Sequence, residues 1–181
     1  LPMSLSLFRG SLVLPDSILE DGLLAVDKGR ICFAGPQVEV PYEDVSSAVA
    51  IPGGYIAPGL VDIHVHGGAG ADYMDGSLEA IRASNRAHAH HGTTTLFPTT
   101  TTGQPGQISR MLEGCISCKT GWTIGDGARI GGVHYYGPYF AEDKVGCHSV
   151  EGRRDPCPEE YKACFDLEII QVATCAAELP G

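Results

Sequence analysis

The sequence predicts an α/β protein in two parts, a small β-sandwich domain over residues 1–57 followed by parallel βα units over residues 58–181. Short apolar segments separated by turns fill the first part, a pattern that is typical of hairpins. In the second part, apolar runs alternate with helical stretches, as in strands connected by helices. The composition, with 43% hydrophobic and 19% charged residues, is that of a globular chain and excludes an intrinsically disordered one.

The first part is expected to be a series of hairpins. Two apolar segments, 22–26 and 30–34, flank a turn at residues 27–29, whose glycine can adopt a positive φ. Another strand is expected over residues 48–51, ended by the Pro-Gly-Gly of residues 52–54. Hairpins of this length suit a small β-sandwich, which is too short to bury a large core alone.

The second part predicts four strands with helices between them. One helix is expected over residues 77–91, with Ser77 as its N-cap and Gly92 just past its end. A second helix is expected over residues 107–117. The four strands are expected over residues 60–66, 93–100, 129–136 and 167–174.

Four strands connected in this way make only the first half of a (β/α)₈ TIM-like barrel, which needs eight strands. An open half-barrel would leave two unpaired sheet edges and half of its core in contact with water. We therefore expect either a missing C-terminal half in a longer polypeptide, or pairing with another copy of the chain as a homodimer.

Charge and hydropathy exclude several classes of partner. The formal net charge is −10 at pH 7, whereas a nucleic-acid partner calls for a clustered basic surface. No apolar run approaches the ~20 residues of a membrane helix, and no secretory signal is expected. Seven cysteines in no regular framework indicate reduced thiols, so we expect a cytoplasmic protein without nucleic-acid or membrane partners.

Three further groups of residues are interpreted as structural. The histidines of residues 88–91 lie at the end of the first expected helix, where they can contact backbone carbonyls. Cys115 and Cys118 form a lone C-x-x-C without a second pair, and are interpreted as ordinary thiols. The basic pair Arg153-Arg154 is interpreted as a solvated loop feature.

The most informative segment is P-G-L-V-D-x-H-x-H at residues 58–66. His64 and His66 are two positions apart in an expected strand, so their side chains point to the same face, as two metal ligands from one strand must. The C-terminal end of a barrel strand is where active sites form. Asp62 shares that face one step back, and we expect it to hold a ligand imidazole through a hydrogen bond.

Five motifs, in this order and spacing, resemble the N-acetylglucosamine-6-phosphate deacetylase family of the amidohydrolase superfamily. They are A-P-G-L-V-D-x-H-x-H-G-G, H-G-T-T-T-x-F-P-T-T, G-V-H-Y-Y-G-P-Y-F, K-V-G-C-H and A-A-E-L-P-G. Together these motifs are specific, whereas any one of them alone is weak. They cover residues 57–68, 91–100, 132–140, 144–148 and 176–181.

The resemblance implies a deacetylase that hydrolyses the acetamide of N-acetylglucosamine 6-phosphate in amino-sugar catabolism, with an amino-sugar phosphate as its small-molecule partner. It also implies a divalent metal, zinc or iron, that lowers the pKa of bound water and polarises the amide carbonyl. His64 and His66 match metal-ligand positions of the family. His148 matches a histidine that contacts the substrate, and the backbone at Cys147 lies beside it.

One position departs from the family pattern. Tyr136 stands where the family has a metal-binding glutamate. A phenol with a pKa near ~10 is a poor ligand at neutral pH unless the metal itself ionises it. The family's catalytic aspartate and its later metal histidines lie beyond the region that the chain covers, so the catalytic residue is unknown.

Two alternatives stay open beside the deacetylase. The first is a truncated, catalytically inactive homologue that acts as a binding or interaction module, which the tyrosine at position 136 favours. The second is an amidohydrolase for a cyclic amide or an N-acyl amino acid, because such relatives share the histidine motif of residues 58–66. Metal content separates the first alternative from the enzymes.

Overall fold

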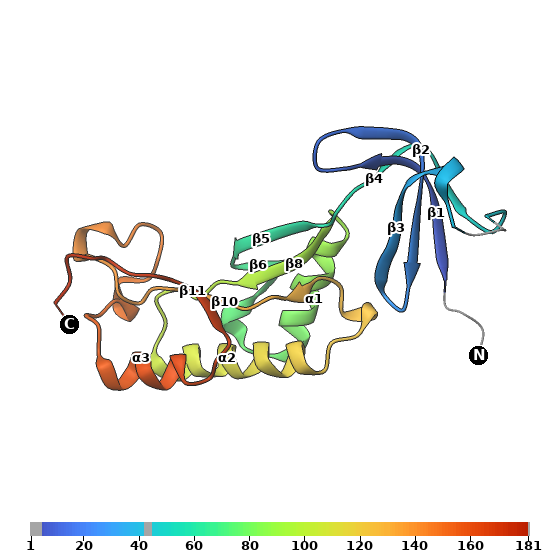
Figure 1. Cartoon of the computed structure of the whole chain (residues 1–181). Coiled ribbons are helices and arrows are strands. Elements are labelled where there is room, and N and C mark those ends of the chain that lie inside the picture. The colour runs from blue at the N-terminus through green and yellow to red at the C-terminus, as the bar shows by residue number, and fades with distance from the viewer. Residues whose placement is uncertain (1–4, 42–44, 181) are drawn as a thin grey trace. The chain divides into compact units, whose positions relative to one another are not determined.

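The computed structural model describes residues 5–41 and 45–180 of the chain (Figure 1). The chain divides into two compact units, Leu1–Pro58 and Gly59–Gly181. Each unit has its own cluster of buried apolar side chains. The described residues of the first unit are built mainly on strands, whereas those of the second unit combine strands with helices.

The first unit is built on a sheet of four strands, β1 (Ser6–Val13), β2 (Ile18–Asp27), β3 (Arg30–Pro36) and β4 (Val49–Ile56). Their order is β3-β2-β1-β4: the first three pair antiparallel, and β4 returns to pair in parallel with β1. Leu7, Leu23 and Ala25 form the buried core of this unit. Its described strands lie in one sheet, so the two-sheet sandwich stays a prediction.

The turn between β2 and β3 follows the expectation from the sequence. Asp27 pairs with Arg30, so that two residues connect the strands. Lys28 and Gly29 have φ angles of 49° and 74°, which are the left-handed values that a tight hairpin turn requires. The predicted turn is therefore confirmed.

The end of the fourth strand differs from the expectation. Residues 52–54 were predicted to end this strand, but β4 runs through Pro52 and continues to its last residue, Ile56. Its pairing with β1 shifts register between Arg9 and Ser11. An edge strand with such an irregularity tolerates proline, because its outer N–H groups have no ladder partner to lose.

The second unit holds four successive parallel strands, of which the third is in two pieces. They are β5 (Leu60–Val65), β8 (Thr93–Pro98), β9 (Arg129–Ile130) with β10 (Val133–Tyr136), and β11 (Ile170–Thr174). β5, β8 and β9 pair in parallel in this order, and β10 pairs in parallel with β11. A parallel bridge between Thr99 and His134 joins the end of β8 to β10. A short hairpin follows β5 and consists of β6 (Gly67–Gly68) and β7 (Ala71–Asp72).

Two glycines interrupt the third strand, which the sequence predicted as one piece over residues 129–136. A Cβ on Gly131 would lie 2.8 Å from the ring of Phe97, and a Cβ on Gly132 would lie 2.2 Å from Cγ of Gln171. Side chains of β8 and β11 thus occupy the space beside the strand at this point. Only glycine fits there, and the strand divides.

Three helices connect the strands within the described residues, α1 (Leu78–Ala89), α2 (Pro105–Thr120) and α3 (Pro158–Phe165). The Ser77 hydroxyl accepts a hydrogen bond from the N–H of Ala80 at 3.1 Å, and Gly92 follows α1 with a φ of 92°. Both predicted helix-end residues are therefore confirmed. α2 is longer than predicted at both ends, because it begins at Pro105, a residue that suits the first helical turn, and continues to Thr120. Short 3₁₀ turns cover Gln37–Glu39, Tyr73–Asp75, Ile124–Asp126, Glu142–Lys144 and Val150–Gly152.

The core of the second unit lies between its strands and helices α1 and α2. Leu96 of β8, Ile81 of α1, and Met111 and Leu112 of α2 are fully buried in one cluster. Burial of each such side chain contributes about 1.5–3 kcal/mol. No helix within residues 5–41 and 45–180 is both long and apolar enough to cross a membrane.

Strand β5 lies at the edge of this parallel sheet in the described part of the chain. Its apolar side chains Leu60, Val61 and Ile63 are 62%, 61% and 57% exposed. Strands and helices alternate in the order expected of successive βα units (Figure 1). Closure into an eight-stranded barrel stays a prediction.

Candidate functional site

The carboxyl ends of β5 and β10 bring five ring side chains together, and we call them the histidine cluster. β5 contributes His64, and His66 directly follows the last residue of this strand. β10 contributes His134 and Tyr136, and the loop after β10 contributes His148. The His64 ring lies 4.9 Å from that of His66 and 5.0 Å from that of His134. The Tyr136 ring lies 4.8 Å from that of His64 and 5.3 Å from that of His148.

His64 and His66 point to the same side of the sheet. Their Nε2 atoms are 3.1 Å apart, and their rings are nearly perpendicular, at 87°. Val65 between them is buried, as strand alternation requires of the intervening residue. Because β5 pairs in parallel with β8, the two imidazoles lie where the carboxyl ends of parallel strands meet.

The surroundings disfavour the charged form of two histidines of the cluster. Burial lowers the pKa of His64, and the neighbouring rings of His66 and His134 lower it further. Burial, followed by the effect of His66, lowers the pKa of His148. Both shifts favour the neutral imidazole, which has a lone pair on one ring nitrogen. A lone pair of this kind can bind a metal ion.

Thr99, at the end of β8, orients His66. Its carbonyl oxygen lies 3.2 Å from Nδ1 of His66, and its hydroxyl accepts a hydrogen bond from the N–H of Val65 at 2.9 Å. A carbonyl oxygen only accepts hydrogen bonds, so Nδ1 of His66 carries the proton. The lone pair of His66 then lies on Nε2, the atom that faces His64.

Asp62 holds the backbone of the strand end. Its Oδ1 accepts a hydrogen bond from the N–H of His64 at 3.0 Å. This contact differs from the predicted one, in which the carboxylate would hold a ligand imidazole. The short aspartate side chain reaches the N–H two residues ahead more readily than a ring, a local pattern common for this residue type.

His134 joins the cluster although its sequence motif predicted no role for it. The residue is 7% exposed, and its Nδ1 lies 3.3 Å from Nδ1 of His64 and 3.1 Å from the carbonyl oxygen of Ile63. Its Nε2 lies 2.9 Å from the hydroxyl of Thr174 on β11. One signal could have identified it: His134 is two positions before Tyr136, so both face the same side of one strand.

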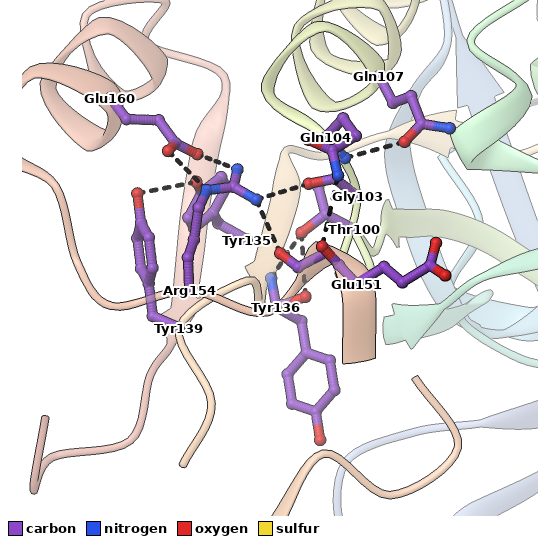
Figure 2. A network of polar contacts seen from close by, with 11 residues as sticks. Thr100, Gly103, Gln104, Gln107, Tyr135, Tyr136, Tyr139, Glu151, Arg154 and Glu160 are labelled. Carbon is purple, nitrogen blue, oxygen red and sulfur yellow. Dashed lines mark hydrogen bonds and ion pairs between the residues drawn. The ribbon is translucent and has the colours of Figure 1, made fainter. Parts of the chain in front are cut away.

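Tyr136, the one departure from the motifs of the resemblance, is the last residue of β10. Its backbone is fixed by Thr100, whose hydroxyl accepts from the N–H of Tyr136 at 2.8 Å and donates to its carbonyl at 3.2 Å (Figure 2). The phenol ring packs between His64 and the ring of Phe140, which is 5.0 Å away. The structure thus places an aromatic side chain beside the histidine pair.

His148 and Cys147, the two residues predicted to contact the substrate, differ from each other in where their side chains lie. The His148 ring lies 5.9 Å from that of His66 and 5.0 Å from that of Phe140, inside the cluster. Cys147 is an exposed free thiol on the same loop. The structure brings the His148 side chain to the site and leaves the Cys147 side chain exposed.

Arg154 joins the loops that follow β8 and β10 (Figure 2). Its Nη1 donates to the carbonyls of Gly103 at 2.8 Å and Gly152 at 2.7 Å. Its Nε donates to Glu160 at 2.7 Å, and its Nη2 forms an ion pair with the same carboxylate. The interpretation of Arg153-Arg154 as a solvated pair is therefore wrong for both residues, because the Arg154 side chain is 24% exposed and that of Arg153, which donates to the Phe140 carbonyl at 2.7 Å, is 19% exposed. The five donors of a guanidinium suit a point where several acceptors meet.

His88 contacts a backbone carbonyl, as the sequence predicted. Its Nε2 lies 2.9 Å from the carbonyl oxygen of Gly67, the residue after His66. The contact joins the last turn of α1 to the hairpin that follows β5. His90 and His91 are exposed beyond this point.

The residues of the cluster fit part of a divalent-metal site. Two imidazole nitrogens on one tetrahedral zinc ion, each bound at about 2.0–2.1 Å, are separated by about 3.3 Å. The Nε2 atoms of His64 and His66 are 3.1 Å apart, which is close to this value. Within the described part of the chain, no group of three or more His, Cys, Asp or Glu side chains could hold a metal ion. The fit therefore extends to two ligands.

Sequence comparisons relate the chain to known enzymes, although no protein-family model matches it. It is 29% identical to N-acetylglucosamine-6-phosphate deacetylase of Bacillus subtilis over 172 residues, which are 93% of this chain and 43% of that protein. It is 34% identical to the protein of the same name from Vibrio furnissii over 159 residues, which are 85% and 38% of the two chains. Imidazolonepropionase of Rhizorhabdus wittichii is 45% identical over 49 residues, 27% of this chain. The chain thus spans less than half the length of the deacetylases that it matches.

Solved structures show the same fold. The deacetylase of Pasteurella multocida is 23% identical and superimposes with a TM-score of 0.86, over 97% of this chain and 46% of that one. The deacetylase of Mycobacterium smegmatis is 24% identical, with a TM-score of 0.82 over 97% and 48% of the two chains. The predicted α/β class is therefore confirmed.

Proposed function

We propose that this chain, a relative of the N-acetylglucosamine-6-phosphate deacetylases, forms part of the active site of a metal-dependent amidohydrolase. The observation that carries the proposal is the distance of 3.1 Å between the Nε2 atoms of His64 and His66. Similarity to a deacetylase over 93% of the chain supports the chemistry. The proposed reaction is hydrolysis of the acetamide of N-acetylglucosamine 6-phosphate in the cytoplasm.

His64 and His66 would hold the divalent ion, zinc or iron. When bound, such an ion lowers the pKa of a water molecule and polarises the amide carbonyl. Thr99 would orient His66, because its carbonyl fixes the proton on Nδ1 and leaves Nε2 for the ion. Tyr136 offers a phenol where the family has a carboxylate, so the further ligands are proposed to come from residues outside this chain.

His148 would contact the substrate from the loop after β10. Burial lowers the pKa of His148, so its neutral ring can donate one hydrogen bond and accept another from a sugar hydroxyl. The rings of Phe140 and Tyr136, at 5.0 Å and 5.3 Å from it, offer apolar faces on which a sugar ring can stack. Cys147 would contribute through its backbone.

The remaining parts of the site are proposed to lie in a second half of the barrel. The chain covers 43% and 38% of two deacetylases, which leaves room for four further βα units. The exposed apolar side chains of β5 support this, because a neighbouring strand would cover them. The catalytic aspartate and the phosphate-binding residues would belong to that half.

A second candidate function is an inactive homologue that acts as a binding module. Two observations favour it: Tyr136 lies beside the histidine pair, and the described residues offer no group of three or more metal ligands. An amidohydrolase for a cyclic amide is a third candidate, favoured by the match to imidazolonepropionase over 49 residues.

Metal analysis of the purified protein that contains both halves of the barrel tests the proposal. We expect stoichiometric zinc or iron in the unchanged protein and its loss in the double variant His64→Ala with His66→Ala. His90→Ala, which removes an exposed histidine at the end of α1, is the matched control and should retain the metal. A folded protein without metal would support the binding module instead.

The choice between substrates is tested with the protein that contains both halves of the barrel. We expect hydrolysis of N-acetylglucosamine 6-phosphate to be faster than that of the unphosphorylated sugar. Turnover of a cyclic amide, with neither acetylated sugar hydrolysed, would favour the third candidate.

A further inference from the structure

We propose that Arg154 is a positioning residue, which holds the loop after β10 so that His148 and Phe140 face the substrate. The inference rests on the proposed function, because it concerns the substrate contacts named there. Arg154 lies near the far end of this loop, residues 137–157. Its own contacts are with backbone carbonyls and with Glu160 of α3 (Figure 2).

One nitrogen of Arg154 bridges the two loops that follow β8 and β10. Its Nη1 donates to the carbonyl of Gly103, in the loop after β8, at 2.8 Å, and to that of Gly152, in the loop after β10, at 2.7 Å. The two backbones approach closely here, because a Cβ on Gly152 would lie 2.5 Å from the carbonyl oxygen of Thr102. A larger residue at position 152 would separate the loops, so this glycine and the shared donor together keep them in contact.

Glu160 fixes the direction in which the guanidinium points. Its carboxylate accepts from Nε of Arg154 at 2.7 Å and forms an ion pair with Nη2. Nη1 is thereby left for the two carbonyls, which the planar fork of a guanidinium allows and the point charge of a lysine does not. The side chains of Arg154 and Glu160 are 24% and 15% exposed, so water competes little for these hydrogen bonds.

The loop that Arg154 holds carries the two rings that the proposed function places against the substrate. Arg153 donates from Nε to the carbonyl of Phe140 at 2.7 Å, and the N–H of Arg154 donates to that of Pro138 at 3.3 Å. The arginine pair therefore also fixes the beginning of the loop. His148 lies between these fixed points in the chain, with its ring 5.0 Å from that of Phe140. A shift of the loop would move both rings relative to the histidine pair.

The inference predicts an effect on substrate binding rather than on the chemical step. Arg154→Met keeps an unbranched side chain and removes its donors. We expect KM for N-acetylglucosamine 6-phosphate to rise by about 10–100-fold, as for a contacting group displaced by about 1 Å. We expect kcat to stay within about threefold, because the displaced rings bind substrate and transition state alike. Steady-state kinetics of the protein that contains both halves of the barrel measures both constants.

A double variant separates the positioning role from a loss of stability. Arg154→Met alone leaves the carboxylate of Glu160 without its charged partner, which destabilises the fold. Arg154→Met with Glu160→Gln removes that charge, so we expect thermal stability to recover. KM should stay raised, because the carbonyls of Gly103 and Gly152 still lack their donor. Recovery of KM together with stability would overturn the inference.

Arg82→Met is the matched control, because it removes an ion pair at the opposite ends of the strands. Nε of Arg82 on α1 lies 3.0 Å from Oδ1 of Asp126, which is placed shortly before the first residue of β9. We expect KM of this variant to equal that of the unchanged protein. A rise as large as that of Arg154→Met would contradict the inference, since a general loosening of the fold would then explain both.

Hydrogen exchange followed by mass spectrometry tests the same role without any turnover. In Arg154→Met we expect faster exchange of the amides in residues 138–154, whereas those in residues 108–118 of α2 should exchange as in the unchanged protein. Equal acceleration of both segments, or of neither, would argue against a role confined to the loop.

The outcomes separate the two proposals. If the unchanged protein hydrolyses neither acetylated sugar, the proposed function fails, and the substrate-positioning role of Arg154 fails with it. If the unchanged protein is active and Arg154→Met has the same KM, the proposed function stands and the positioning role alone is refuted.

Discussion

Strands β5 and β8 are neighbours in one parallel sheet, but their side chains meet different surroundings. β8 pairs on both sides, and its Leu96 is fully buried against α1 and α2. β5 pairs on one side within the described residues, and Ile63 is 57% exposed. The strand that carries the histidine pair is thus also the strand whose apolar side chains lack cover. Within the described residues, β5 and its histidines therefore have a neighbouring strand on the side of β8 and none on the opposite side.

The largest expected effect concerns the inner strand. Leu96→Ala removes a fully buried side chain from the core, so we expect the free energy of unfolding to fall by about 2–5 kcal/mol. Urea unfolding followed by the fluorescence of Trp122, the single tryptophan, measures it. Ile63→Ala on β5 is the matched control, and an equal loss in both variants would contradict the difference between the strands.

A smaller effect is expected where the loops beside the site are joined. Glu160→Gln removes the charged partner of Arg154, and we expect a loss of about 1.5–3 kcal/mol, as for hydrogen bonds to charged groups. The same urea experiment measures the change. Asp21→Asn, in an exposed ion pair with Arg9, should change little. A neutral result for Glu160→Gln would show that the loops hold together without the ion pair.

The rate at which a reagent modifies each cysteine compares buried with exposed positions directly. Burial raises the pKa of Cys115, Cys118 and Cys164, whereas Cys147 and Cys175 are exposed. A thiol-specific reagent at pH 8 should modify the exposed cysteines at least about tenfold faster, because the thiolate is the reactive form. Mass spectrometry of the labelled peptides measures this, and uniform labelling would contradict the buried core behind β8.

The same pKa shifts predict how stability depends on pH. Thiols of the unfolded chain ionise with a pKa of about 8.5, whereas the buried thiols keep their protons to higher pH. Above that pH the unfolded state binds fewer protons, so the free energy of unfolding should fall as pH rises. Cys118→Ser should reduce the slope.

The smallest expected effect concerns the exposed edge. Ile63→Ser replaces an exposed side chain, and the free energy of unfolding should stay within about 0.5 kcal/mol. Self-association should decrease, because an apolar surface on an edge strand promotes contacts between chains. Sedimentation velocity of both proteins measures this, and a large loss of stability would show that β5 is covered within the chain itself.

Features that depend on neighbours in sequence were predicted well. Ser77 and Gly92 mark the ends of α1, and Gly29 marks the hairpin turn, because caps and turns are decided within a few residues. Pro52 was misjudged as the end of β4, since tolerance of proline depends on whether a strand lies at an edge. The division of the third strand at Gly131 depends on the Phe97 side chain of β8, which spacing does not reveal.

The sequence by itself determined that His64 and His66 share a face, because alternation is a property of the strand backbone. Only the tertiary structure decided that His134, 70 residues from His64, lies against it, and that Asp62 turns to the backbone. Contacts of this kind depend on how parallel strands pair and on their register. Residues adjacent in space across β5, β10 and β11 have no fixed spacing in the chain, so packing alone selects them.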